Sequence, residues 1–170
     1  VQRSRINKTK FLFEDRSGFL DQLRAEIKSA IRSSEKKGLV PCFRLNLTSD
    51  FKWEETGIFE EFPEVQFYDY TKGKNRMIEY LEGNLPPNYH LTYSRSEKKG
   101  DSVHSKAFLA SGGNVAVVFR GKLPKKWHGY AVINGDESDL RFLDGTGKVI
   151  GLVEKGLAKK DETGFVVEAL

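Results

Sequence analysis

In three segments of this sequence, polar residues alternate with apolar residues, so that polar side chains fall in the middle of an expected strand. They are Arg44 and Asn46 in the segment 42–48, Tyr68 in 65–70, and His90 and Thr92 in 89–94. Alternate side chains of a strand point to opposite faces, so in a sheet these polar groups share one face. A sealed core does not tolerate so many polar groups. We therefore expect this face to line a hollow that holds a ligand, or to meet solvent or a partner.

A second group of polar residues comes where each expected strand ends. Carboxyl ends of parallel strands meet at one edge of a sheet, where α/β proteins bind their ligands. Together with the mid-strand residues, this edge supplies the expected ligand-binding set: Arg44, Asn46, Ser49, Tyr68, Lys72, His90, Thr92, Ser94 and Ser96. Three carboxylates of the same edge, Asp50, Asp69 and Glu97, are candidates for acid–base catalysis. The alternative for Asp50, Asp69 and Ser94 is that each caps a following helix.

The strongest single expectation concerns Arg44. A guanidinium in the middle of a strand is costly to bury unless it is paired. We expect Arg44 to lie in a concave, partly hydrated cleft and to pair with Asp50, Asp69 or Glu97, or with a bound anion.

The sequence contains no clear motif for binding a metal ion or a nucleotide. The segment 134–139, with Arg141 beyond it, is rich in oxygen ligands, but an Asn-Gly-Asp turn explains it better than a calcium loop does. The three histidines have no ligand spacing, and Cys42 is the only cysteine, so we expect no metal site and no disulfide. A phosphate loop, a dinucleotide fingerprint and a nucleophile elbow are absent from the sequence. No cofactor can be named from it.

The elements that must position these residues alternate between strands and helices. Helical spacing of apolar residues predicts a helix over 19–31, and shorter helices are expected over 75–81 and 102–110. Strands are expected over 39–47, 65–70, 89–94, 115–119 and 130–133, and a β-hairpin over 139–153. The expected fold is α/β, with a parallel sheet of about five strands in an open half-barrel or barrel-like form, and a C-terminal β-hairpin.

Length and composition suit one domain over residues 1–170. The chain has 170 residues, of which 38% are hydrophobic and 31% charged, with a net charge of +4. This composition excludes a disordered polymer, and no apolar run is long enough to cross a membrane. We expect a cytoplasmic protein without membrane contact. Because the chain starts at Val1, directly before a basic helical run, we expect a fragment or a processed form.

Several strings of this sequence resemble a family of uncharacterised phage and plasmid proteins. They are Arg44-Leu45-Asn46, Thr48-Ser49-Asp50, the segments 65–72 and 88–97, Gly113 to Phe119 and Val132 to Asp136. The resemblance covers most of the chain and implies family membership but no activity. It also implies that fuller members carry a cysteine-rich segment before the first helix, similar to the cluster-binding start of radical S-adenosylmethionine enzymes. By this resemblance, we expect this sequence to begin after the place where those cysteines would lie.

Three functions are consistent with these features, and whether the protein is an enzyme stays open. The first is binding of a small anionic or nucleotide-like ligand in a polar-lined cleft at the strand ends. The second is a nucleic-acid-binding accessory protein of a mobile element, which would use three basic clusters: residues 3–10, 122–127 and 155–160. The third is a structural or assembly module. The sequence does not fix the oligomeric state.

Overall fold

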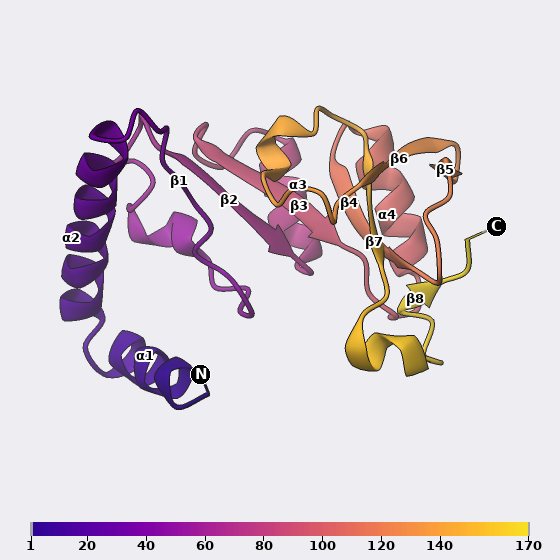
Figure 1. Ribbon diagram of the computed structural model, residues 1–170, viewed down its shortest axis with the longest axis horizontal. Helices are drawn as coiled ribbons and strands as arrows, with labels where there is room; N and C mark the ends of the chain where they lie inside the picture. Colours follow the sequence, from indigo (N-terminus) through magenta and orange to yellow (C-terminus); the bar gives the residue numbers. More distant parts are fainter. Residues whose placement is uncertain (1, 170) are drawn as a thin grey trace.

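A computed structural model describes residues 2–169 and has a mixed α/β architecture (Figure 1). Its helices are α1 (Gln2–Glu14), α2 (Arg16–Glu35), α3 (Lys74–Leu81) and α4 (Asp101–Ala110), with 3-10 turns η1 (Trp53–Thr56), η2 (Arg141–Leu143) and η3 (Gly156–Lys160). Its strands are β1 (Cys42–Phe43), β2 (Gln66–Thr71), β3 (Tyr89–Ser94), β4 (Asn114–Phe119), β5 (Lys126–Trp127), β6 (Tyr130–Asn134), β7 (Val149–Val153) and β8 (Val166–Val167).

The strands form one open sheet in the order β1-β2-β3-β4-β7-β6-β5, and β8 pairs with β4. All pairs are parallel except β5 with β6. The α/β class and the mostly parallel sheet are as expected from the sequence. The number of strands is larger, because β5 and β8 have two residues each and are too short to show a periodicity.

The expected hairpin over 139–153 is wrong. Residues 141–143 form the turn η2, and β7 lies between β4 and β6 and is parallel to both. The chain between β6 and β7, residues 135–148, is therefore a crossover. From β2 to β4 the chain moves across the sheet in one direction, whereas from β6 to β7 it moves back toward β4. Because crossovers between parallel strands are right-handed, a connection that moves back must cross the face of the sheet opposite to the one crossed by the β2-β3-β4 connections.

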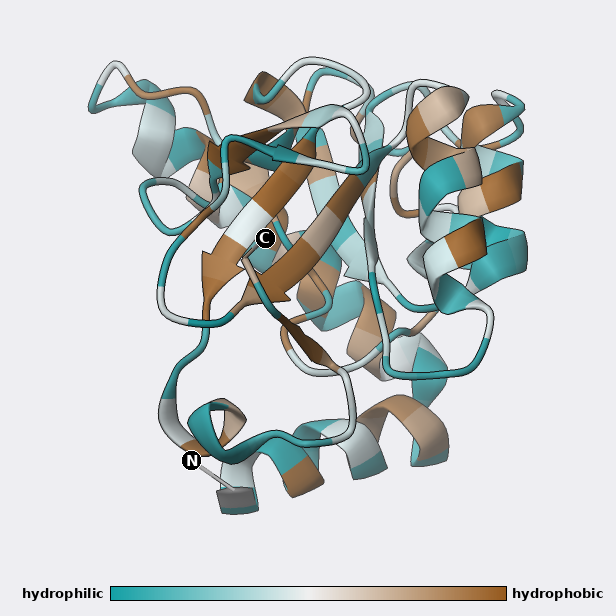
Figure 2. Cartoon of the chain, turned by 90° about the vertical axis from the view of Figure 1, so that its right-hand side faces the viewer, coloured by the Kyte–Doolittle hydropathy of each residue, from teal (hydrophilic) through white to brown (hydrophobic). Residues whose placement is uncertain are grey.

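The face covered by α3 and α4 carries the hydrophobic core. Phe67, Leu91, Tyr93 and Val115 from neighbouring strands are fully buried there. They pack with Met77 and other buried apolar residues of the core, which include Ile27, Ile58, Phe59, Phe108, Leu109, Val117 and Phe119. In Figure 2 the strands at the centre are largely hydrophobic, whereas the loops around them are mostly polar. Burial of this apolar surface is the main force that holds the sheet and helices together.

The opposite face of the sheet carries the polar layer that the sequence predicts. Tyr68 lies beside His90, and Tyr70 beside Thr92, in the register of β2 and β3. The crossover 135–148 covers this layer, with the ring of Phe142 5.5 Å from that of Tyr68. In Figure 1 the crossover lies in front of the sheet and α3 and α4 lie behind it. The polar residues therefore face a loop rather than a second layer of helices.

Candidate functional site

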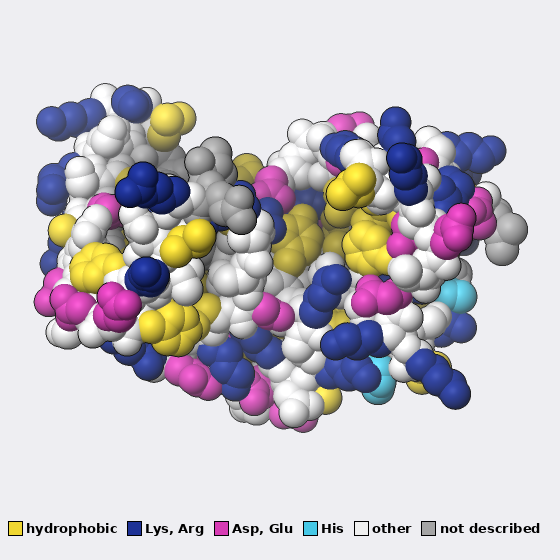
Figure 3. All heavy atoms as spheres, turned by 90° about the horizontal axis from the view of Figure 1, so that it is seen from below, with side chains coloured by type: hydrophobic (Ala, Val, Ile, Leu, Met, Phe, Trp, Pro, Cys, Tyr) yellow, Lys and Arg dark blue, Asp and Glu magenta, His cyan; other side chains and the backbone are white. Residues whose placement is uncertain are grey.

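A pocket of about 690 Å³ opens at the carboxyl ends of the strands. One wall is the segment after β1, the other wall is the start of the crossover 135–148, and the ends of the central strands form the floor. The lining residues are Arg44, Leu47, Thr48, Ser49, Asp50, Tyr70, Thr71, Lys72, Ser94, Ala116, Gly135, Asp136, Glu137, Ser138, Asp139 and Leu152. Figure 3, which looks onto the carboxyl ends, shows the surface hollowed there between two lobes, with apolar side chains in the hollow and basic ones at its rim.

Arg44 joins the two walls of the pocket. Its Nη1 donates to Asp139 Oδ2 at 2.9 Å, and its Nε donates to the Asn46 backbone oxygen at 3.2 Å. The guanidinium lies 4.5 Å from the centre of the Tyr70 ring, in a cation–π contact, and Tyr70 donates to Asp139 Oδ1 at 3.3 Å. The side chain thus lines the pocket. Its carboxylate partner is Asp139 rather than Asp50, Asp69 or Glu97.

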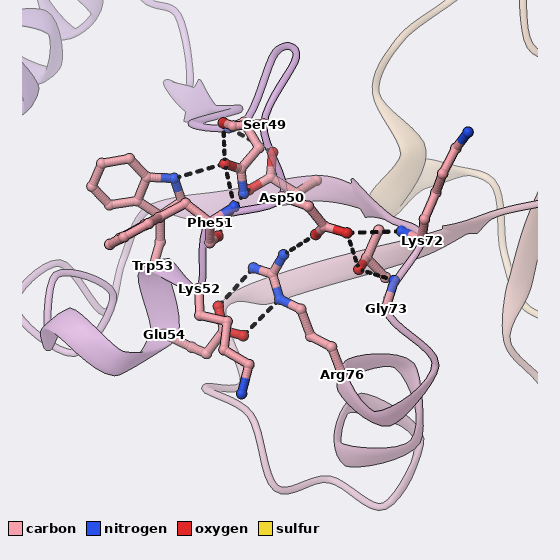
Figure 4. A network of polar contacts seen from close by, with 12 residues as sticks. Ser49, Asp50, Phe51, Lys52, Trp53, Glu54, Lys72, Gly73 and Arg76 are labelled. Atoms are coloured by element: carbon pink, nitrogen blue, oxygen red, sulfur yellow. Dashed lines mark hydrogen bonds and ion pairs between the residues drawn. The ribbon is translucent and has the colours of Figure 1, made fainter. Parts of the chain in front are cut away.

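Asn46 points away from the pocket, contrary to the sequence expectation. Regular strand β1 ends at Phe43, so the period-two rule does not extend to residue 46. Asn46 is buried on the helix-covered side, where its side-chain oxygen accepts hydrogen bonds from the Trp53 indole at 3.1 Å, Ser49 Oγ at 2.7 Å and the Phe51 amide at 3.1 Å (Figure 4). Asn46 therefore shapes the loop that forms the pocket wall.

Asp50 lies at the pocket rim, but its carboxylate is already occupied. One oxygen accepts from the Thr71 hydroxyl and the Lys72 amide, both at 2.9 Å, and the other from Arg76 Nη1 at 2.6 Å (Figure 4). Arg76 is 3% exposed and also holds Glu54 through two bonds of 2.6 Å. Asp50 thus ties the loop after β1 to the end of β2, in a charge-assisted network.

Asp69 lies on the helix-covered face, 1% exposed, and does not line the pocket. Its oxygens accept from the Asn46 amide at 2.9 Å, from Asn46 Nδ2 at 3.2 Å and from the Tyr89 hydroxyl at 3.2 Å. Burial raises the pKa of Asp69 to about 7, against the lowering effects of the bond from the Asn46 backbone amide, of the Arg76 charge and of the bond from Tyr89. The carboxyl group is therefore partly protonated near neutral pH.

The other predicted site residues lie at different depths. Ser49, Lys72 and Ser94 line the pocket. Ser96 is buried and its backbone amide donates to Asp101 at 2.7 Å, whereas Glu97 is exposed in the loop before α4.

His90, Thr92 and Tyr68 lie beneath the crossover, outside the pocket. There the buried guanidinium of Arg141 lies 3.2 Å from Asp144 and donates to the Ser138 carbonyl. Within residues 2–169, most of the buried side-chain atoms without a hydrogen-bond partner gather here: His90 Nε2, Thr92 Oγ1, Arg141 Nε and Nη1, and Asp144 Oδ2. Burial, and secondarily the Arg141 charge, lower the pKa of His90 to about 4, so this ring is neutral.

The segment 134–139 was predicted to form a separate turn, but residues 135–139 of it belong to the site. Asp136, Glu137 and Asp139 all line the pocket. The signal was present, because the segment follows the strand β6, and the carboxyl-end rule applies to that strand as it does to the others. The sequence did not show that β6 lies next to β7 in the sheet, and this position places the loop after β6 beside the rest of the site.

The described residues contain neither a metal-binding cluster nor a membrane-spanning helix. No group of three or more His, Cys, Asp and Glu side chains within residues 2–169 is arranged to hold a metal ion. Over the same range no helix is both long and apolar enough to cross a membrane.

The fold and site define an α/β protein with a mostly parallel sheet and a polar pocket at the strand carboxyl ends. The chain belongs to the gene product 88 family, whose model matches residues 1–169. The family description names no activity, in agreement with the expected phage-type family of unknown function. A comparison with curated proteins gave no match, and neither did a comparison with solved structures.

Proposed function

We propose that this protein binds a small anionic or nucleotide-like ligand in the pocket at the carboxyl ends of its strands. The observation that carries the proposal is the position of Arg44, whose guanidinium faces a pocket of about 690 Å³ at the edge where α/β proteins bind ligands. Ligand pockets commonly measure about 300–1,000 Å³. Lys72 offers a second cation at the rim, and Leu47 and Leu152 offer apolar contact.

The test is the shift in melting temperature across a panel of nucleotides and S-adenosylmethionine. A ligand that binds only the folded state raises the melting temperature. We expect at least one member of the panel to do so, and Arg44→Met to abolish the shift while the fold persists, because methionine keeps the packing and removes the charge. Arg24→Met is the matched control, since Arg24 lies on α2 and pairs with Glu61, and neither residue lines the pocket. A panel without effect, or an unchanged response in Arg44→Met, would contradict the proposal.

Acid–base roles for Asp50, Asp69 and Glu97 remain predictions. Asp50 is the one of the three that lines the pocket. The cysteine-rich segment expected ahead of the first helix also remains a prediction, and the genomic sequence upstream of Val1 tests it.

A second proposed function, nucleic-acid binding, is supported by helix α1. Its basic side chains, Arg3, Arg5, Lys8 and Lys10, are all exposed, and none makes an ion pair within the described residues. Such free cations bind phosphates with a strong salt dependence. Fluorescence anisotropy with single- and double-stranded DNA and RNA tests this, and absent or salt-independent binding would reject it.

A further inference from the structure

We infer that the Asp139 carboxylate occupies the place of a ligand carboxylate, and that the ligand of the pocket carries a carboxylate group that displaces it from Arg44 and Tyr70. This inference rests on the proposed ligand-binding function and names both the chemical class of the ligand and a built-in competitor for the same site.

The geometry around Asp139 is that of a bound carboxylate. Each of its two oxygens has its own donor, Arg44 Nη1 at 2.9 Å and the Tyr70 hydroxyl at 3.3 Å. Both donors line the pocket, and they come from a different part of the chain than Asp139 does. A ligand carboxylate of the same size could therefore accept the same two hydrogen bonds.

The donors are fixed, whereas the carboxylate is held weakly. Arg44 is stacked on the Tyr70 ring at 4.5 Å and is also tied to the Asn46 backbone oxygen. Asp139 lies on the crossover loop, its side chain is 53% exposed, and its carboxylate bonds only to Arg44 and Tyr70 among the described residues. An ion pair this exposed contributes little stability, so a ligand can replace it at little cost.

The charges of the pocket favour a carboxylate over a phosphate dianion. Its lining includes four carboxylates, Asp50, Asp136, Glu137 and Asp139, against the two cations Arg44 and Lys72. Asp50 and Asp136 are paired with Arg76 and Lys155, respectively, but Glu137 has no cationic partner among the described residues. A second negative charge on the ligand would face this acidic wall at short range.

The test titrates the protein with sodium acetate and, separately, with inorganic phosphate at constant ionic strength. Binding is followed by NMR on the Arg44 Nε–H resonance, which is assigned by its loss in Arg44→Met. We expect Asp139→Asn to bind acetate about two- to fivefold more tightly than the unmodified protein, the equivalent of an exposed ion pair. Tyr70→Phe removes one donor and is expected to weaken acetate binding about tenfold.

Glu137→Gln is the matched control, because it makes the same charge change in the same loop without touching Arg44. Competition at Arg44 predicts a clearly larger gain for Asp139→Asn than for Glu137→Gln, whereas a general loss of negative charge predicts equal gains. Equal gains, no gain in Asp139→Asn, or a gain for phosphate alone would each overturn the inference. If acetate binds no variant while a member of the nucleotide panel stabilises the protein, the inference fails and the proposed function stands. Circular dichroism confirms that each variant is folded.

Discussion

The guanidinium of Arg76 holds the carboxylate of Glu54 through two parallel hydrogen bonds of 2.6 Å, with side chains that are 3% and 6% exposed. This bidentate pair connects α3 to η1, and a third bond from Arg76 reaches Asp50 at the pocket rim. The loop that forms one wall of the pocket is thus attached to the buried Arg76–Glu54 pair through the partly exposed carboxylate of Asp50. Removal of one partner leaves the other charge buried without compensation.

Arg76→Met is therefore expected to destabilise the protein by about 3–5 kcal/mol, the usual cost of breaking a buried ion pair. Chemical denaturation measures this change in the free energy of unfolding. The control is Arg24→Met, which removes an arginine from a partly exposed pair with Glu61 and should cost much less stability, because solvent screens such a pair. Similar losses in the two variants would mean that the buried network adds no special stability.

The raised pKa of Asp69 predicts a pH dependence of stability. Its carboxyl group has a pKa of about 7 when folded, against an ordinary value of 3.8. Between these values the unfolded chain has lost a proton that the folded protein keeps, so stability from this group falls as pH rises from about 4 to about 7. The slope is at most about 1.4 kcal/mol per pH unit. The contribution of Asp69 to this slope should disappear in Asp69→Asn. Equal slopes of unfolding free energy against pH in the two proteins would refute the prediction.

Gly135 should not tolerate a side chain. A Cβ atom there would lie 2.6 Å from Ile150 Cγ2 and 3.0 Å from both Leu152 Cδ2 and Arg141 Nη1. Gly135→Ala is expected to lose about 1–3 kcal/mol through overpacking. Gly38→Ala is a useful comparison, because that position has a positive φ of 64° but no atom within 4 Å of the added Cβ. Thermal denaturation should show the larger loss for Gly135→Ala, and the reverse order would disprove the steric account.

Arg141 and Asp144 should behave as a coupled pair beneath the crossover. The guanidinium is 1% exposed, and its Nη1 lacks a hydrogen-bond partner. Asp144→Asn alone leaves the charge uncompensated and is expected to cost about 3 kcal/mol, whereas the double change Arg141→Met with Asp144→Asn should cost about 1 kcal/mol or less. A double-mutant cycle measures the coupling. Additive losses would show that the two side chains do not interact.

Local patterns in the sequence were sufficient to predict much of the fold. Helical spacing predicted the helix over 19–31, which lies within α2. The structure shows that Asp15 caps this helix, since its side chain accepts a hydrogen bond from the Gly18 amide at 2.9 Å. The alternation in β2 and β3 placed Tyr68 and His90 on one polar face, and their register pairing agrees. These features depend on the geometry of neighbouring residues along one element, which the sequence displays directly.

The partners of the site residues depend on contacts between distant segments. Arg44 and Asp139 are 95 positions apart, and Asn46 and Asp69 are 23 apart. Local periodicity carries no information about such pairings. It also failed at Asn46, because β1 ends at Phe43 and the chain then turns toward the helix-covered face. The sequence alone therefore determined the longer helices, the central strands and the polar face of the sheet, but not the two-residue strands β5 and β8 or the turn η2. Only the tertiary structure decided that β7 inserts between β4 and β6, because strand order follows from packing of the whole chain, and this insertion brings Asp139 to Arg44.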